Sequence, residues 1–157
     1  MAKFRKEKKG GTPSISTASL PDIVFMLLFF FMVSTVMREV QLKVDVKVPG
    51  ATEVKKLEKK SLVSYIYIGE PKKSFQRTYG TEPRIQLNDA FATPNDIRDF
   101  IASEREKLSE SERPKMTTSL KVDSDTKMGI VTEVKQELRK ASALKINYST
   151  REVLNVY

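Results

Sequence analysis

Residues 19–32 read SLPDIVFMLLFFFM, and this apolar run decides the fold of the N-terminal part of the chain. From residue 23 to residue 33 no side chain is polar, so a helix formed here has no face to turn toward water. A helix in the core of a soluble domain would normally keep a polar side. The run therefore predicts a membrane-spanning helix, and the soluble core helix is the weaker alternative.

The length of the run determines where this helix has to begin. The hydrocarbon core of a bilayer takes about 20 residues, each rising about 1.5 Å. The stretch 23–37, which contains no charged residue, supplies only 15 residues. Extension upstream, through small and apolar residues, costs less than extension past Arg38 and Glu39. The sequence therefore predicts a transmembrane helix over 15–37.

A cleaved signal peptide is another interpretation of the same run. The processing site would then fall in MVST (32–35). However, the charge ahead of the apolar region of a signal peptide is normally basic rather than acidic, and Ser-Thr-Val is a poor small-x-small cleavage site. A permanent anchor remains the prediction.

The upstream start places Asp22 inside the helix, about 5–10 Å from its beginning. One interpretation is a helix cap at headgroup depth, where the macrodipole favours an anion. The other is a functional acid, because a carboxylate inside a span costs several kcal/mol and burial favours its protonated form. On a helical wheel Phe29 and Val33 share the face of Asp22, whereas Ser34 and Thr35 lie about 120° or more away. A partner for the carboxylate is therefore expected on another subunit or in water.

Composition excludes several kinds of chemistry. The 157 residues contain neither cysteine nor histidine, which rules out disulfide scaffolds, thiolate zinc sites, Ser-His-Asp catalysis and histidine-ligated metals. Proton chemistry must fall to Asp, Glu, Lys or Tyr. No phosphate-binding loop or catalytic cluster is present, so we expect no enzymatic activity, no cofactor and no metal site.

The charge is concentrated at the N-terminus. The net charge is +8, and five basic residues precede the apolar run within the first nine positions (Lys3, Arg5, Lys6, Lys8 and Lys9). A basic arm can bind nucleic acid, but directly ahead of an apolar span a cytoplasmic anchor that faces anionic lipid is the simpler interpretation. The excess of Lys and Arg on this side is slight, yet the short basic tail favours a cytoplasmic N-terminus and an exported C-terminal part.

The rest of the chain divides into three parts. Residues 1–14 form a basic tail, and 38–60, rich in Lys and Glu, are most simply a linker. From residue 61 the pattern is globular. Strand patterns lie at 62–69, 119–123 and 144–148, with weaker ones at 74–79 and 84–87 and a short edge strand at 152–157. Helical patterns lie at 97–108, starting from Thr93-Pro94, and at 131–141. This order predicts a small α+β domain over 61–157, of ββαβαβ type, with an antiparallel or mixed sheet and two helices.

The stretch VDSDTKMG (122–129) invites a calcium-loop interpretation through Asp123 and Asp125. The glycine comes one place late for such a loop, and Lys127 occupies a ligand position. We therefore expect these two aspartates to cap the helix that follows.

The order of these features resembles the ExbD/TolR family. The resemblance rests on PDIVFMLLFFFMVST (21–35), with its single acid near the helix start, on VDVKVPGA (44–51), and on LKVDSDTKMGIVTEVKQELRKASALKI (120–146). Two departures stand out. Pro21 is adjacent to the aspartate, where many members have the proline three residues before it, and residues 69–93 are longer than the compact core of the family.

The resemblance implies a proton-channelling subunit of an ion-driven motor in the bacterial inner membrane, with the C-terminal domain in the periplasm. Such subunits work as a homodimer inside a pentamer of a multi-span ExbB- or TolQ-like protein. The motor converts proton-motive force into work on a TonB- or TolA-like protein for outer-membrane transport. By this resemblance Asp22 is the proton carrier, and the proton is the coupling ion.

The same resemblance makes Val44, Val46, Val48 and Pro49 candidate contacts for the third protein or for β-pairing in the dimer. An ordinary solvated linker with β-propensity is the alternative for these four residues. At the level of function, the alternative is a membrane-anchored periplasmic binding or adaptor module without ion translocation, with Asp22 as a cap and peptidoglycan as one conceivable contact. The sequence leaves open whether the output serves nutrient import or envelope maintenance.

Overall fold

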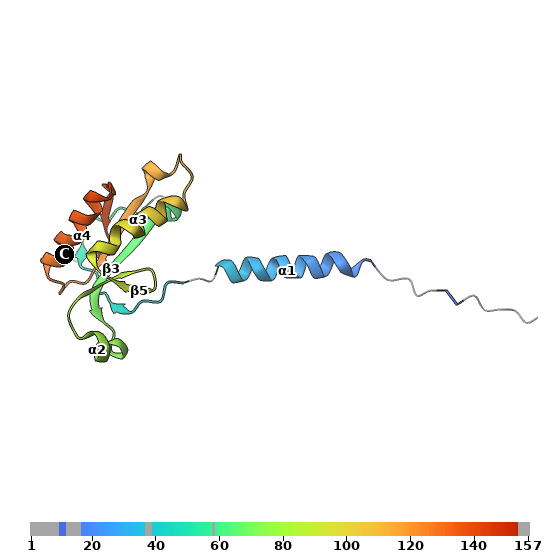
Figure 1. Cartoon of the computed structure of the whole chain (residues 1–157), viewed down its shortest axis with the longest axis horizontal. Coiled ribbons are helices and arrows are strands. Elements are labelled where there is room, and N and C mark those ends of the chain that lie inside the picture. Colours follow the sequence, from blue (N-terminus) through green and yellow to red (C-terminus); the bar gives the residue numbers. More distant parts are fainter. Residues whose placement is uncertain (1–9, 12–16, 37–38, 58, 154–157) are drawn as a thin grey trace, which may run out of the picture. The chain divides into compact units, whose positions relative to one another are not determined.

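The computed structural model describes residues 10–11, 17–36, 39–57 and 59–153 (Figure 1). The chain forms two compact units, Met1–Glu39 and Val40–Tyr157. The first contains the helix α1 (Ser19–Val36), and the second contains the remaining elements. The unit with the sheet thus begins at Val40, within the stretch predicted as a linker and ahead of the predicted domain start at 61.

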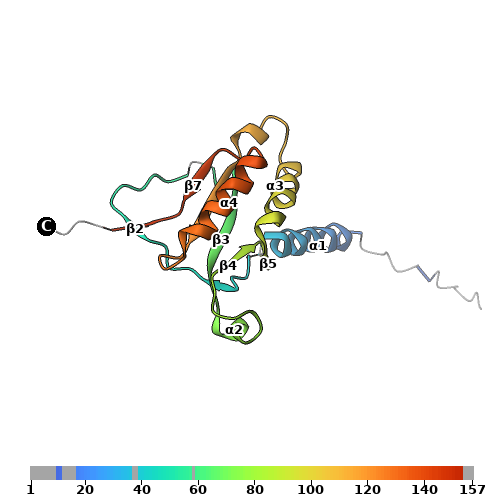
Figure 2. The ribbon, with the colours of Figure 1, turned by 60° about the vertical axis from the view of Figure 1, so that its left-hand side comes forward.

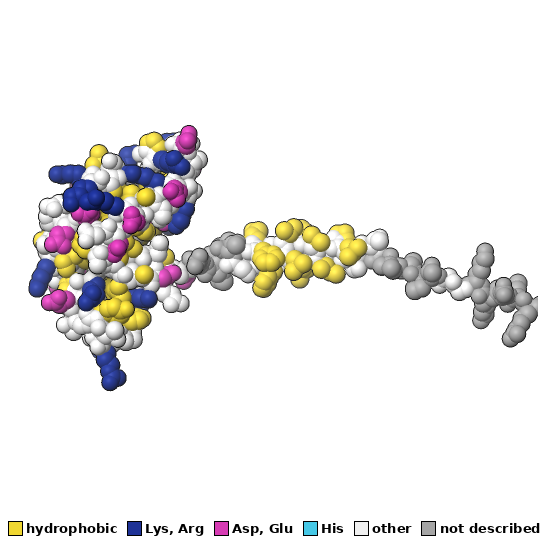
Figure 3. Space-filling view, viewed as in Figure 1, with side chains coloured by type: hydrophobic (Ala, Val, Ile, Leu, Met, Phe, Trp, Pro, Cys, Tyr) yellow, Lys and Arg dark blue, Asp and Glu magenta, His cyan; other side chains and the backbone are white. Residues whose placement is uncertain are grey.

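Helix α1 is shorter than the predicted span of 15–37. It starts at Ser19, after a turn at 17–18, and residues 15, 16 and 37 lie outside the described residues. Its side chains from Ile23 to Val33 are all apolar and exposed. Figure 3 shows the apolar side chains on the visible side of the helix. Across the described ranges, no helix combines the length and the apolar character needed to cross a membrane.

The second unit is a mixed sheet with helices on one face. Its strands are β1 (Val44–Asp45), β2 (Gly50–Ala51), β3 (Val63–Pro71), β4 (Arg84–Leu87), β5 (Ala90–Ala92), β6 (Thr117–Val122), β7 (Ile146–Tyr148) and β8 (Arg151–Glu152). Its helices are α2 (Lys73–Tyr79), α3 (Ile97–Glu106) and α4 (Met128–Lys140), with short 3-10 turns at Lys60–Leu62, Pro94–Asp96 and Arg113–Lys115. The main sheet has the order β5-β4-β3-β6-β7, and β1 pairs with the end of β3, while β2 and β8 form a separate parallel pair.

This arrangement confirms the small α+β domain. Strands β4 and β5 continue antiparallel from β3, whereas β6 and β7 run parallel to it, so the sheet is mixed. The parallel connections pass through α3 and α4, and both helices lie on the same side of the sheet in two views (Figures 1 and 2). One face of the sheet is therefore covered by helices.

The hydrophobic core lies between this face and the two helices. Alternate residues of β3, Ile66 and Ile68, are fully buried in it. The helical spacing seen in the sequence supplies the other side, from α3 (Ile97, Phe100 and Ile101) and α4 (Val131, Val134 and Leu138). The predicted helix start is also confirmed, because Asp96 Oδ2 accepts hydrogen bonds from the Thr93 N–H and from Thr93 Oγ1, both at 2.8 Å.

The prediction of a weak strand at 74–79 is wrong, because these residues form α2. They lie in an insertion beyond the β3–β4 partners Gly69 and Arg84. Strand β1 pairs with this end of β3 only as far as Pro71, so no strand of the described residues pairs with 74–79. Gly80 ends the helix with a positive φ of 77°, a conformation that suits glycine, and its N–H donates to Gln76 O at 2.9 Å.

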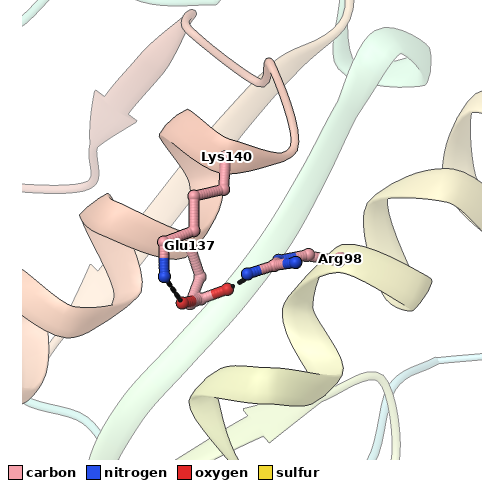
Figure 4. A network of polar contacts seen from close by, with 3 residues as sticks. All are labelled: Arg98, Glu137 and Lys140. Carbon is pink, nitrogen blue, oxygen red and sulfur yellow. Dashed lines mark hydrogen bonds and ion pairs between the residues drawn. The ribbon is translucent and has the colours of Figure 1, made fainter.

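A three-residue ionic contact joins the two helices over the core. The nearly buried carboxylate of Glu137 on α4 accepts a hydrogen bond from Arg98 Nε of α3 at 2.9 Å and one from Lys140 Nζ at 2.7 Å (Figure 4). The Lys140 hydrogen bond, with a smaller contribution from Arg98, holds the pKa of Glu137 below its ordinary value, although burial acts in the opposite direction.

We expect this contact to make stability depend on pH. A carboxyl with a lowered pKa in the folded state stabilises the fold above its unfolded pKa, and this stabilisation is lost as the pH falls through the folded value. Glu137→Gln should therefore unfold at a lower urea concentration than wild type at pH 7, and the difference should shrink below about pH 4.5. The exposed Glu133→Gln on the same helix is the control, with little difference at any pH. A deficit in Glu137→Gln that stays constant from neutral to acid pH would contradict the role of its charge.

Strand β1 approaches β3 closely at Gly69. A Cβ added at residue 69 would collide with the backbone carbonyl of Asp45 in β1. Gly69→Ala should therefore displace β1 and lower the free energy of unfolding by about 1–3 kcal/mol. The control is Gly129→Ala in the first turn of α4, where an added Cβ meets nothing within 4 Å and alanine suits a helix. Denaturant unfolding of both variants gives the comparison, and equal stability would mean that β1 does not pack on Gly69.

Candidate functional sites: Asp22 and the groove on the open face

Asp22 lies in the first turn of α1. It follows the first helical residue, Ser19, by three positions, or about 4.5 Å along the axis, slightly nearer the start than predicted. Its side chain is exposed and makes no hydrogen bond or ion pair with the described residues. A carboxylate at this position lies at the positive end of the helix dipole. The position of Asp22 is therefore the same whether the residue caps the helix or carries protons.

The second site is an open groove of about 730 Å³ on the face of the sheet opposite α3 and α4. Strand alternation turns Tyr65 and Tyr67 of β3 toward it, because their neighbours Ile66 and Ile68 point into the core. Valines of the segment before β3, Asn147 of β7 and the residues after β7 contribute to its lining: Val46, Val48, Val54, Asn147, Ser149 and Thr150. We call this the open-face groove.

The open-face groove combines aromatic rings with positive charge. Lys121 Nζ of β6 lies 4.8 Å from the ring centroid of Tyr65 and 5.4 Å from that of Tyr67, and the two rings stack with centroids 6.3 Å apart. Burial, and to a lesser extent the neighbouring Tyr65, raise the pKa of Tyr67, so its phenol stays a hydrogen-bond donor at neutral pH. Lys55, Lys56 and Lys60 add charge, and no Asp or Glu lines the groove within the described ranges. Such a surface suits an extended ligand that offers apolar groups and negative charge.

The four predicted contact residues lie in different environments in the structure. Val44 is 1% exposed and belongs to β1, so it does not line the groove. Val46 and Val48 are half-buried and line it. Pro49 is exposed, and its carbonyl accepts the Arg151 N–H at 2.9 Å beside the β2–β8 pair. In the described residues, the solvated-linker alternative therefore does not describe this segment.

Residues 40–51, which we call the strap, are held to the domain by side chains as well as by strand pairing. Gln86 of β4 is fully buried, and its Oε1 accepts the Lys43 N–H at 2.8 Å. Its Nε2 donates to Gln41 O at 2.8 Å and to Asn88 O at 2.7 Å. The Gln86 amide thus takes the place of a neighbouring strand for this part of the strap.

Asp123 also holds the strap, and its predicted capping role is wrong. The N-terminal end of α4 has no side-chain cap, and Asp123 Oδ1 instead accepts the Lys47 N–H at 2.7 Å. Asp123 Oδ2 accepts the Asp125 N–H at 3.3 Å within the turn. In the described ranges no group of acidic residues is close enough to hold a metal ion. Asp123 is therefore a positioning residue for the wall of the groove.

Sequence reasoning missed the aromatic and basic residues of the open-face groove, Tyr65, Tyr67 and Lys121, and it missed Gln86, which holds the strap. One signal was present in LVSYIYIG (62–69), where both alternating sets of side chains are mainly apolar or aromatic, with Ser64 as the one polar side chain. A strand that is apolar on one face only would alternate with polar residues, so this pattern predicts a second contact face.

The two units define a protein with an apolar, singly charged N-terminal helix and a small α+β domain that carries a ligand-sized groove. The chain belongs to the ExbD/TolR family, because the model of that family, described as biopolymer transport protein ExbD/TolR, matches residues 8–153. Members of the family are inner-membrane proteins of energy-transducing systems for biopolymer transport, and they generally work with ExbB or TolQ and with TonB or TolA. No curated protein and no solved structure matches the chain.

Proposed function

We propose that the protein is the proton-channelling subunit of an ion-driven motor in the bacterial inner membrane, with Asp22 as the proton carrier. The observation that carries this proposal is the position of Asp22. It is the one acidic residue in Ser19–Val36, on a helix whose surface is apolar on every side. A carboxylate in such surroundings is costly to keep unless another protein or water supplies its partner.

Helix α1 is the element that meets the membrane in this motor. Its 18 residues rise about 27 Å, against about 30 Å for the hydrocarbon core. Local thinning of the bilayer, or flanking residues of the predicted span, would make up the difference. The N-terminus then lies in the cytoplasm, and Val40–Tyr157 lies in the periplasm. A dimer of such helices sits inside a pentamer of a multi-span ExbB- or TolQ-like protein.

The free energy for the motor comes from protons that cross through this complex. Each elementary charge that moves through 100 mV is worth about 2.3 kcal/mol. Asp22 loads a proton on one side and releases it on the other. The second unit passes the resulting movement to a TonB- or TolA-like protein, whose contact is the open-face groove with Val46 and Val48 in its lining.

An anchored binding or adaptor module is the second candidate function. The stacked tyrosines and lysines of the open-face groove favour it, because they suit a ligand that carries carboxylates, such as peptidoglycan. In that case α1 is only an anchor, and Asp22 only a cap.

Affinity purification of the full chain in mild detergent tests the assembly. We expect a multi-span membrane protein and a TonB- or TolA-like protein to purify with it. Lys121→Glu reverses the charge between the two tyrosines, and it should lose the TonB- or TolA-like protein while it keeps the multi-span protein. The matched control is Arg139→Glu at an exposed position of α4, outside the lining of the groove, which should keep both. Recovery of the wild-type chain as a monomer without a multi-span protein would count against the proposed motor.

A further inference from the structure

The insertion between β3 and β4, residues 72–83, is basic. We call it the α2 hairpin. It carries Lys72, Lys73 and Arg77 against one acid, Glu82. The ion pairs of the described residues join other side chains, so none of these three basic groups is neutralised by an ion pair within the described part of the domain. The hairpin therefore presents a net positive surface.

Aromatic rings of the hairpin pack against Phe91 of β5. The Phe91 ring centroid is 5.9 Å from that of Phe75 and 4.6 Å from that of Tyr79. Two further cations, Lys43 and Arg84, lie over the Phe75 and Tyr79 rings at 5.7 Å and 5.5 Å. Tyr79 is 39% exposed, so an amphipathic ring accompanies the charges at the surface. Basic residues together with tyrosine are the side chains that the interface of a bilayer favours.

The fold separates the α2 hairpin from the other helices of its unit. In two views α2 projects from one end of the sheet, apart from α3 and α4 (Figures 1 and 2). It therefore adds nothing to the core between these helices and the sheet.

The base of the hairpin is tied to the chain that leaves α1. The Lys72 N–H donates to Lys43 O at 2.8 Å. Lys43 follows Val36, the last residue of α1, by seven positions, and a fully extended chain of that length reaches at most about 25 Å. If α1 ends at a membrane surface, the chain keeps the base of the hairpin within about that distance of the surface.

We infer that the α2 hairpin docks on the anionic phospholipid headgroups of the membrane that holds α1. This inference rests on the proposed function, since it requires α1 in the bilayer. The short tether keeps the hairpin near the surface, and attraction between its cations and anionic lipid acts within a Debye length of about 8–10 Å. Docking would fix the height and orientation of the open-face groove above the membrane.

Reconstitution of the full chain in lipid nanodiscs tests this inference. Because the chain has no cysteine, Ser74→Cys supplies a single exposed labelling site on α2. Ser111→Cys, exposed in the loop between α3 and β6, is the matched control site. A fluorophore on each cysteine is read against lipids that carry a quencher on the headgroup, in phosphatidylcholine nanodiscs with and without phosphatidylglycerol.

With phosphatidylglycerol present, we expect several-fold stronger quenching at residue 74 than at residue 111. The excess should disappear in pure phosphatidylcholine, at high salt, and in the triple variant Lys72→Gln, Lys73→Gln, Arg77→Gln. The salt series leaves the basic residues unchanged, so it remains decisive even if the triple variant folds poorly.

Equal quenching at both sites in anionic nanodiscs would overturn the inference. Strong quenching at residue 74 that is the same with and without phosphatidylglycerol would also overturn it. Shielding of residue 74 only after addition of the partner proteins would assign the hairpin to a protein surface instead. Retention of the chain by the nanodisc is measured separately by size-exclusion chromatography. A chain that is not retained contradicts the membrane anchor, whereas a retained chain with an unquenched label contradicts the docking alone.

Discussion

Asp22→Asn should abolish the energised output of the protein while leaving its level and its assembly unchanged. Asparagine has nearly the size of aspartate and still accepts hydrogen bonds at a helix start, so it preserves much of a capping role. It does not bind and release a proton, so it removes proton carriage. In cells that carry the variant as their sole copy, energised uptake across the outer membrane or envelope integrity should fall to the level of a deletion.

The matched control is Asp22→Glu, which keeps a titratable carboxyl one methylene further from the helix. It should retain part of the activity. Proton flux through the reconstituted complex gives a second measurement, with Asp22→Asn at background and Asp22→Glu above it. If Asp22→Asn supported uptake and integrity at the wild-type level, proton carriage would be excluded, and the adaptor function with Asp22 as a cap would stand.

Gln86→Met should cause the largest loss of stability in the second unit, about 2–4 kcal/mol. Methionine matches glutamine in length but makes none of its three hydrogen bonds, so the Lys43 N–H and the carbonyls of Gln41 and Asn88 lose a buried partner. An unsatisfied buried polar group typically costs about 1–3 kcal/mol, and the exposure of Gln41 moderates the sum.

The matched control is Gln136→Met, at an exposed position of α4, which should unfold at nearly the wild-type denaturant concentration. Loss of the strap should also open one wall of the groove, so hydrogen exchange at Lys43 and Lys47 should speed up in Gln86→Met. Equal stability of the two methionine variants would show that Gln86 does not hold the strap.

Most of the domain could be predicted because its elements have strong local signals. The helical spacing of Ile97, Phe100 and Ile101, and the start at Thr93–Asp96, describe α3 without any tertiary information. The β-rich run at 62–69 and the alternation in 119–123 likewise correspond to β3 and β6. The failure at 74–79 has a clear reason, since short apolar-polar alternation forms a strand only where a neighbouring strand offers hydrogen bonds.

Only one of the two candidate sites could be recognised from the sequence. Asp22 is recognisable there because it is a single charge in an apolar run. The open-face groove cannot be recognised in this way, because its lining residues come from β3, β6, the strap and the segment 147–150. Tyr65, Lys121 and Val46 become neighbours only after parallel pairing of β3 with β6 and docking of the strap.

By itself, the sequence determined the apolar helix with its single acid, the α+β order and the absence of thiol and imidazole chemistry. Each of these follows from composition or from periodicity within a few turns or strands. Tertiary structure alone decided that residues 40–51 are a strap, that Asp123 binds Lys47 across 76 residues rather than capping α4, and that two tyrosines and a lysine share one groove. The physical reason is that a backbone hydrogen bond can be satisfied by any donor or acceptor that the fold brings near, and local pattern carries no information about which distant segment that is.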